Sequence, residues 1–229
     1  DRAAKLELGD SYHKEVADAV ASAELVIFCA PLGANTALAQ ASAPALAEGA
    51  IVSDVGSCKR SVIDDVTPHL PDHALLVPAH PVAGTEHSGP DAGFAELFDG
   101  RWCILTPEAG TDQRAIDKVS TLWQQVGSNV EIMDADHHDL VLAVTSHAPH
   151  LIAYTMVGVA DDLGKVTLLN SYTNTLPPVL ADGGSTHNVF NHAHRMLFIS
   201  YRSVKPSLIS GIIFIQQPPF FLQHDFNRN

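Results

Sequence analysis

The sequence is poor in cysteine and in basic residues, and both shortages narrow what the protein can be. It holds three cysteines, Cys29, Cys58 and Cys103, in 229 residues. Three widely spaced thiols suggest neither a disulfide framework nor a thiolate metal site, so a reducing cytoplasm is the expected compartment. Thirteen Lys and Arg against 26 Asp and Glu give a net charge of −13. Because nucleic-acid binding draws on clustered cations, a nucleic-acid partner is disfavoured.

Long hydrophobic runs are lacking as well. The first 16 residues, DRAAKLELGDSYHKEV, contain no apolar core of a signal peptide. The longest late apolar run, LISGIIFI, is far shorter than the ~20 residues that span a bilayer. We therefore expect no targeting segment and no membrane helix. With 46% hydrophobic and 17% charged residues, the composition is that of a folded globular protein.

Short apolar runs alternate with amphipathic stretches between residues 24 and 134. The apolar runs, bounded by Gly, Pro or Asp, predict strands at LVIFCAP (25–31), AIVSDVG (50–56), ALLVPAH (74–80), WCILTP (102–107) and NVEIMD (129–134). The stretches between them predict helices over 35–49, 59–70 and 111–127, with Gly127 where a cap would fall. Strands rich in Val, Ile and Leu that alternate with helices predict an α/β fold with a parallel sheet covered on both faces.

The strand pattern ends after Asp134. Residues 134–164 predict a helix with a break or kink at Pro149, and so the start of a second, helical domain. The charge also changes here, because residues 1–164 hold 24 acidic and 8 basic residues, whereas residues 165–229 hold 2 and 5. Prolines and polar clusters leave no assignable element beyond residue 164.

Two loops that follow predicted strands carry candidate site residues. In DVGSCK (54–59), Gly56 allows close backbone approach at the carboxyl end of a strand, where ligands bind in doubly wound sheets. Alternatively, Gly56 and Ser57 only make the turn, with Ser57 as a helix cap. In AHPVAGTEHSG (79–89), His80 is placed to meet a substrate, and a histidine can accept a proton near neutral pH. A structural role for His80 is the alternative.

A third cluster lies in the predicted helix. His147 and His150, three residues apart, could face the same way, and the sequence HHD precedes them at 137–139. Substrate contact is the favoured role for this pair, and capping or packing at the core edge is the alternative. A metal-dependent hydrolase is a remote hypothesis that would use His137, His138, Asp139, His147 and His150. The sequence has neither HExxH nor paired cysteines, so we expect no metal.

These stretches, in this order, resemble the prephenate/arogenate (cyclohexadienyl) dehydrogenase family. The matching signatures are DVGSCK, AHPVAGTEHSG, LFDGRWCILTP and VTSHAPHLIAY, over about residues 15 to 165. The resemblance implies an oxidoreductase that performs the NAD-dependent oxidative decarboxylation of prephenate or arogenate in tyrosine biosynthesis. NADP and the choice between the two substrates stay open. It also implies a homodimer, and together with the composition we expect a cytoplasmic protein with no nucleic-acid or membrane partner.

Residue roles follow from the same resemblance. His80 matches the family's catalytic histidine, which accepts the proton of the substrate hydroxyl, and Ser57 matches a serine between nicotinamide and substrate. Further substrate contacts are implied for Thr85, Glu86, His147 and His150. The CAPLGA turn (29–34) matches a segment beside the dinucleotide, which implies cofactor binding by Ala30, Pro31, Leu32, Gly33, Gly56 and Ser57.

The sequence departs from the family pattern at both ends. No GxGxxG turn precedes residue 54, and no GFRDFTRIA-like segment follows Val166. We therefore expect an incomplete Rossmann-like, doubly wound sheet over residues 1–133 and the start of a helical substrate or dimerisation domain over 134–166. Residues 167–229 are unassigned and not family-like, which a reading-frame change would explain. An inactive chain that serves only as an interaction module is the alternative function.

Overall fold

In a computed structural model, the described parts of the chain are residues 2–84, 89–163, 212–215 and 221–224. Contacts divide the chain into two compact units, and each is described by itself. The first unit is Asp1–Asp139 together with Ala193–Asn229, and the second is Leu140–His192. Of residues 167–229, which the sequence leaves unassigned, the structure describes two strands, β8 (Ile212–Ile215) and β9 (Phe221–His224).

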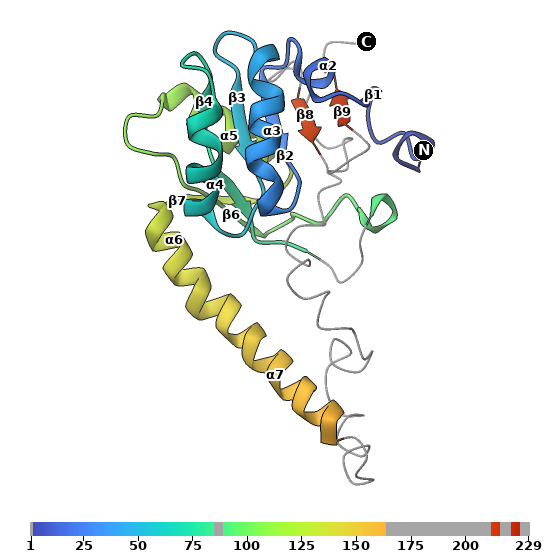
Figure 1. The fold of residues 1–229 in the computed structure, drawn as a ribbon, viewed down its shortest axis with the longest axis vertical. Coiled ribbons are helices and arrows are strands. Elements are labelled where there is room, and N and C mark those ends of the chain that lie inside the picture. The colour runs from blue at the N-terminus through green and yellow to red at the C-terminus, as the bar shows by residue number, and fades with distance from the viewer. Residues whose placement is uncertain (1, 85–88, 164–211, 216–220, 225–229) are drawn as a thin grey trace. The chain divides into compact units, whose positions relative to one another are not determined.

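The first unit is built on a six-stranded sheet with the order β1-β9-β8-β2-β3-β4 (Figure 1). Strands β2, β3 and β4 pair in parallel, as does β8 with β2, whereas β9 is antiparallel to both of its neighbours. The strand bounds are Ser11–His13 (β1), Leu25–Phe28 (β2), Ile51–Asp54 (β3) and Leu75–Leu76 (β4). The predicted α/β class and Rossmann-like parallel core are confirmed.

A second, three-stranded sheet has the order β5-β6-β7, with bounds Ala79–Pro81 (β5), Trp102–Leu105 (β6) and Asn129–Ile132 (β7). Strand β5 runs antiparallel to β6, and β6 runs parallel to β7. The prediction of one strand over residues 74–80 is therefore wrong. The N–H of Val77 still donates to Val52, but the carbonyl of Pro78 accepts from Thr106, so the chain changes sheets between these two residues. Pro78 has no N–H to continue the first ladder.

Helices cover both faces of the six-stranded sheet because side chains of β2 alternate between two hydrophobic cores. Leu25 and Ile27 belong to one core, and Val26 and Phe28 to the other. In Figure 1, α3 (Asn35–Ser42) and α4 (Lys59–Val66) lie in front of the sheet and α5 (Gln113–Gln125) lies behind it. The short helices α1 (Arg2–Lys5) and α2 (Val16–Val20) precede β2.

Prolines end two of these helices, and a glycine follows the end of a third. Helices α3 and α4 are shorter than predicted, since each passes into a 3₁₀ turn that contains a proline, Ala43–Ala45 and Thr67–His69. Helix α5 begins at the N-cap Asp112, whose carboxylate accepts from the N–H of Arg114 at 2.9 Å. It ends at Gln125, and Gly127 lies just beyond this end, where the sequence predicts a cap, in a left-handed conformation with φ +93°. A Cβ there would lie 2.1 Å from Oδ1 of Asp99, so the position needs glycine.

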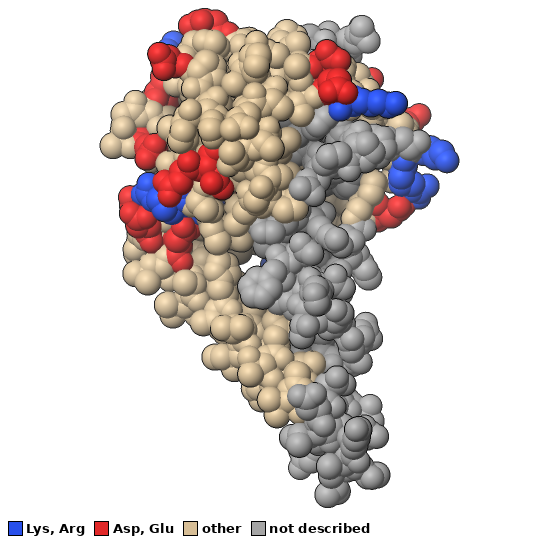
Figure 2. All heavy atoms as spheres, viewed as in Figure 1, with Lys and Arg blue, Asp and Glu red and all other residues tan. Residues whose placement is uncertain are grey.

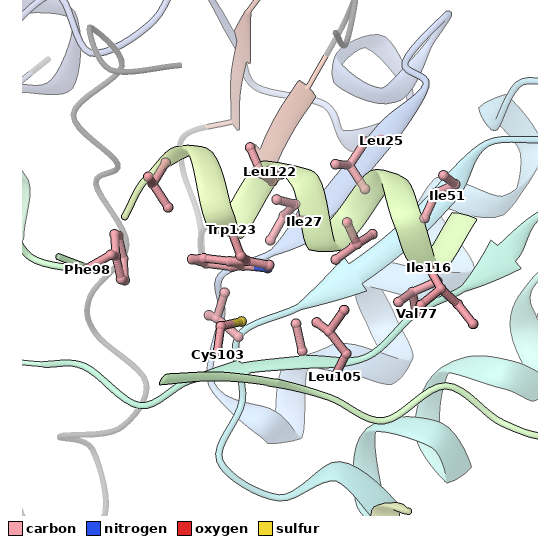
Figure 3. Close-up of a cluster of buried hydrophobic side chains, with 14 of the residues drawn as sticks. Leu25, Ile27, Ile51, Val77, Phe98, Cys103, Leu105, Ile116, Leu122 and Trp123 are labelled. Carbon is pink, nitrogen blue, oxygen red and sulfur yellow. The ribbon is translucent and has the colours of Figure 1, made fainter. Parts of the chain in front are cut away.

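The core behind the sheet is centred on α5. Figure 3 shows Trp123 and Leu122 on this helix facing Leu25 and Ile27 on one side, with Cys103 and Leu105 on the other. Trp123 is fully buried, and its ring meets Phe98 edge to face, with centroids 5.3 Å apart. Helix α5 thereby joins the six-stranded sheet to the three-stranded one.

The second unit is described as helix only. Helix α6 (Ala135–Leu142) begins at the end of the first unit and is followed by a π-helical turn, Ala143–His147, and by α7 (Ala148–Leu163). The predicted irregularity at Pro149 is thus a π turn just before it, which accommodates the missing N–H of the proline. The large apolar side chains Leu140, Val144, Leu151 and Met156 are exposed on this helical stretch.

One described helical stretch, Ala135–Val159, is long and apolar enough to cross a membrane. Length and composition alone do not separate such a segment from the core helix of a globular protein. Its first turn is polar, and His138 in it is fully buried within the first unit. The expectation of no membrane helix stays a prediction.

Charge on the first unit is mainly negative. Figure 2 shows acidic side chains spread over the visible face and basic side chains next to some of them. Arg60, for example, lies 2.8 Å from Asp136 and 3.8 Å from Glu108. The expectation of no nucleic-acid partner stays a prediction.

The packing of Trp123 gives a test of the fold. We expect Trp123→Ala to lower the free energy of unfolding by about 3–5 kcal/mol, because it leaves a large cavity between two sheets. The matched control is Trp102→Ala, since Trp102 is 54% exposed and its loss should cost far less. Urea denaturation followed by circular dichroism measures both. Equal losses would show that α5 is not packed as described.

Candidate functional site

A buried ion pair lies where β3 gives way to α4. Asp54 is the last residue of β3 and Lys59 the first of α4, and Lys59 Nζ lies 2.5 Å from Asp54 Oδ2. The side chain of Asp54 is 2% exposed and that of Lys59 is 0% exposed. The N–H of Gly56 also donates to Asp54 Oδ2 at 2.7 Å, so the same carboxylate shapes the turn between strand and helix.

The ion pair also holds the next strand of the chain. The N–H of Ala79 donates to Asp54 Oδ1 at 3.1 Å, and the carbonyl of Ala79 accepts from Lys59 Nζ at 2.7 Å. Both polar groups of one residue in β5 are therefore bound by the pair. Because His80 follows Ala79 directly, the ion pair fixes the backbone from which the His80 side chain projects.

The side chain of His80 is held by a chain of two further residues. His80 Nδ1 lies 2.9 Å from Nε2 of His138, and the rings meet edge to face with centroids 5.1 Å apart. His138 Nδ1 in turn lies 2.7 Å from Oδ1 of Asp139. His80 is 8% exposed and His138 is fully buried, so the hydrogen bond between the two rings is shielded from water.

Asp139 is itself fixed by the start of α4. Its carboxylate accepts from the N–H groups of Lys59, at 2.7 Å, and Arg60, at 2.9 Å. These N–H groups have no partner within the helix, and a carboxylate there is favoured by the helix dipole. The N-cap position belongs to Cys58, which makes no capping hydrogen bond with its side chain. The alternative in which Ser57 caps this helix is therefore wrong.

The surroundings shift the pKa values of this cluster. Burial lowers the pKa of Lys59, and the Asp54 carboxylate counteracts it. Burial also lowers the pKa of His138 against the upward effect of Asp139, which favours the neutral ring. Partial burial of Asp139 acts to raise its pKa, but the N–H groups of Lys59 and Arg60 and the His138 ring outweigh it, and the pKa is lowered. Neutral His138 thus lies beside an ionised Asp139.

The predicted cofactor residues gather at the carboxyl ends of β2 and β3. These strands are parallel neighbours with Phe28 opposite Asp54, so their following turns lie at the same edge of the sheet. A Cβ on Gly56 would meet Leu32 Cδ2 at 2.6 Å, which shows that the two turns touch. Each turn leads into a helix N-terminus, at Asn35 and Lys59. This fits a dinucleotide, which binds against close backbone and helix N-termini.

The predicted substrate residues are only partly brought together. Ser57 is buried in the turn before α4, which Asp54 ties to the strand of His80. Thr85 and Glu86 lie outside the described residues. His147 ends the π-helical turn and His150 is exposed in α7, both in the second unit. The roles assigned to these residues stay predictions.

Sequence reasoning missed the contacts that organise the site. It took Asp54 and Lys59 as the edges of a turn motif, and it placed His138 and Asp139 in a metal hypothesis. Charged residues beside an apolar strand were the available signal for the ion pair. Among the residues that the structure describes, no three His, Cys, Asp or Glu side chains form a group that could hold a metal ion. All three cysteines are free thiols.

The family model and the curated relatives indicate one family. Residues 1–132 match the family model for the nucleotide-binding domain of prephenate dehydrogenase. The cyclohexadienyl dehydrogenase of Zymomonas mobilis is 48% identical over 165 residues, which cover 72% of this chain and 56% of that protein. The chain thus spans about half the length of this curated relative.

Two solved structures of prephenate dehydrogenase are also similar to this chain. Prephenate dehydrogenase from Aquifex aeolicus matches with a TM-score of 0.69 and 28% identity over 83% of this chain and 69% of that one. Its complex with hydroxyphenyl propionate and NAD+ matches with a TM-score of 0.59 and 29% identity over 73% of this chain and 60% of that one.

Removing one partner of the buried ion pair should be costly. We expect Lys59→Met to lower the free energy of unfolding by about 3–5 kcal/mol, because Asp54 is left as an uncompensated buried charge. The control is Lys118→Met, which breaks the partly exposed pair with Glu24 and should cost roughly 0–1 kcal/mol. Urea denaturation at neutral pH measures both. Similar costs for the two variants would contradict the structural role of the pair.

The lowered pKa of His138 predicts a pH dependence of stability. Between its folded value and the ordinary value of 6.5, the unfolded chain binds a proton that the folded chain does not. The stabilising contribution of His138 is therefore complete above pH 6.5 and is lost as the pH falls through its folded value. Asp139 acts in a separate, lower window, below its ordinary 3.8.

Urea midpoints measured from pH 7.5 to 4.5 test this. The midpoint of the unaltered chain should fall more steeply on acidification than that of His138→Gln, because glutamine does not titrate. Two parallel curves would mean that His138 is not held neutral.

Proposed function

Since the chain belongs to the prephenate dehydrogenase family, we propose that it performs the NAD-dependent oxidative decarboxylation of prephenate, arogenate or both. The observation that supports this most directly is the placement of His80. It lies in β5 directly after Ala79, whose N–H and carbonyl are both bound by a buried ion pair, and its ring is hydrogen-bonded within the same unit. A base held in one orientation suits proton abstraction from a substrate hydroxyl.

In this proposal, His80 accepts the hydroxyl proton as the ring carbon of the substrate is oxidised to a carbonyl. The ring carboxylate then leaves as carbon dioxide, its bonding electrons complete the aromatic ring, and the former carbonyl oxygen takes up a proton to become the hydroxyl of the phenol. Ser57, in the neighbouring turn, orients the hydroxyl toward His80. The mostly buried surroundings of His80 and Ser57 keep water from competing for the transferred proton.

The nucleotide would be held by the touching turns after β2 and β3, through Ala30, Pro31, Leu32, Gly33, Gly56 and Ser57. NAD, when bound, supplies the hydride acceptor that the oxidation needs. The residues present fit this role, because Gly56 leaves room only for backbone beside Leu32 and because two helices begin at these turns. The NAD+ complex of the Aquifex aeolicus enzyme supports the choice of nucleotide.

The proposal also places the chain in the cytoplasm, which agrees with its free thiols. Thr85, Glu86, His147 and His150 are proposed to contact the substrate, and a homodimer is the expected assembly. The proposed domains are residues 1–133 for the nucleotide and 134–166 for the start of the helical part.

Measurements of enzymatic turnover test the role of His80 as the proton acceptor. The full chain, with NAD and either prephenate or arogenate, should produce NADH absorbing at a wavelength where NAD does not. His80→Asn should lower kcat by about 10²–10⁴-fold, since the proton acceptor is lost. His73→Asn is the matched control, because the ring of His73 contacts the carbonyl of Leu46 and lies near the carboxylate of Glu48, and neither of these residues belongs to the groups that hold His80.

Two outcomes would overturn the proposal. Unchanged turnover in His80→Asn would remove His80 from the reaction. An absence of turnover by the unaltered chain with both substrates and with NAD and NADP would favour an inactive interaction module. Calorimetric titration with NAD then shows whether nucleotide binding remains.

A further inference from the structure

We propose that His138 and Asp139 are positioning residues that hold His80 as the tautomer with its proton on Nδ1, so that Nε2 is the nitrogen that accepts the substrate proton. The inference deepens the proposed function and rests on it for the chemical role of His80. The hydrogen-bond geometry behind it is independent of substrate. Each step follows from which atoms can donate and which can only accept.

The first step concerns Asp139. An ionised carboxylate only accepts hydrogen bonds, and this one already accepts from the N–H groups of Lys59 and Arg60. Its 2.7 Å contact with His138 Nδ1 therefore requires a proton on that nitrogen. Oδ1 of Asp139 accepts from the N–H of Lys59 and from the ring N–H of His138, and Oδ2 accepts from the N–H of Arg60, so three donors keep the carboxylate in this orientation.

The second step concerns His138. A neutral imidazole with its proton on Nδ1 carries a lone pair on Nε2. Full burial of the ring favours this neutral form. The groups that act on its charge are Asp139 and Asp54, which favour the cation, and Lys59, which opposes it. With His138 neutral, its Nε2 is an acceptor.

The third step concerns His80. Its Nδ1 lies 2.9 Å from the accepting Nε2 of His138, so Nδ1 must carry the proton that forms this hydrogen bond. In the neutral His80 ring, Nε2 is then unprotonated and basic. Reversing the direction of either hydrogen bond would change this result. If His138 were protonated on Nε2, for example, His80 Nδ1 would have to accept, and the proton of the neutral His80 ring would lie on Nε2.

This arrangement has a chemical consequence. When His80 Nε2 takes the proton of the hydroxyl, the positive ring continues to donate from Nδ1 to His138, and His138 continues to donate to Asp139. The positive charge formed during the reaction is therefore stabilised by a carboxylate two hydrogen bonds away, with no further proton transfer. A buried aspartate plays the same orienting part toward histidine in hydrolase triads, there by direct contact.

The tautomer can be measured without turnover. The full chain labelled with ¹⁵N-histidine is examined by NMR at pH 8, and the His80 signals are identified by their loss in His80→Asn. We expect a protonated Nδ1 and an unprotonated Nε2, which have well-separated ¹⁵N shifts. The opposite assignment in the unaltered chain would overturn the proposal without any variant at His138.

Two variants separate positioning from a merely structural role. His138→Phe removes the acceptor, so His80 should move toward the Nε2–H form that predominates for imidazole in water. His138→Gln places an amide oxygen that can accept from Nδ1 and should restore the Nδ1–H form. His73→Gln is the control and should leave the His80 signals unchanged. If His80 keeps one tautomer in all of these variants, the proposal is wrong.

Turnover provides a second, distinct readout on the same full-length variants. His138→Phe should lower kcat by about 10²–10⁴-fold with a smaller effect on KM, whereas His138→Gln should recover part of the loss. No turnover in the unaltered chain, together with the expected tautomer, would count against the proposed function alone. Normal turnover with the opposite tautomer would count against the positioning role alone.

Discussion

The buried ion pair between Asp54 and Lys59 is the constraint on which the rest of the site depends. Neither charge is stable alone in this position, because a single buried ion costs several kcal/mol. Together they satisfy each other and also bind the N–H and the carbonyl of Ala79. The pair lies at a junction between the two sheets, since Asp54 ends a strand of one and Ala79 begins a strand of the other. A packing requirement between sheets thus determines where His80 is placed.

Lys59 connects this backbone constraint to the side chain of His80. Its ammonium group holds the carbonyl of Ala79, while its N–H holds Asp139, and Asp139 in turn holds the ring that contacts His80. Main chain and side chain of His80 are therefore positioned from one point, the first turn of α4. The N–H groups of that turn need an acceptor in any fold. Here the acceptor is Asp139, whose carboxylate also holds the His138 ring that orients His80.

Short-range sequence patterns predicted the features of the fold that depend only on residues close together in the sequence. The alternation of Leu25 and Ile27 with Val26 and Phe28 reflects a strand covered on both faces, and Gly127 follows the end of α5 as its position indicates. The split of residues 74–80 between two sheets was not predicted, because an apolar run carries no signal of which sheet it joins. The contact of His80 with His138 spans 58 positions, and that of Lys59 with Asp139 spans 80. The hydrophobic pattern within one helix or strand carries no information about contacts between residues so far apart in the sequence. The adjacent His138 and Asp139 were also as compatible with metal binding as with a hydrogen bond to His80.

The division of the chain into two units separates two requirements of the proposed reaction. Every described group that orients His80, from Asp54 to Asp139, belongs to the first unit. The tautomer and direction of the base are therefore set within one compact body. His147 and His150 belong to the second unit, and their contacts with substrate stay predictions. It follows that changes to the helical unit should affect substrate affinity, whereas changes at Lys59 or His138 should affect the proton transfer itself.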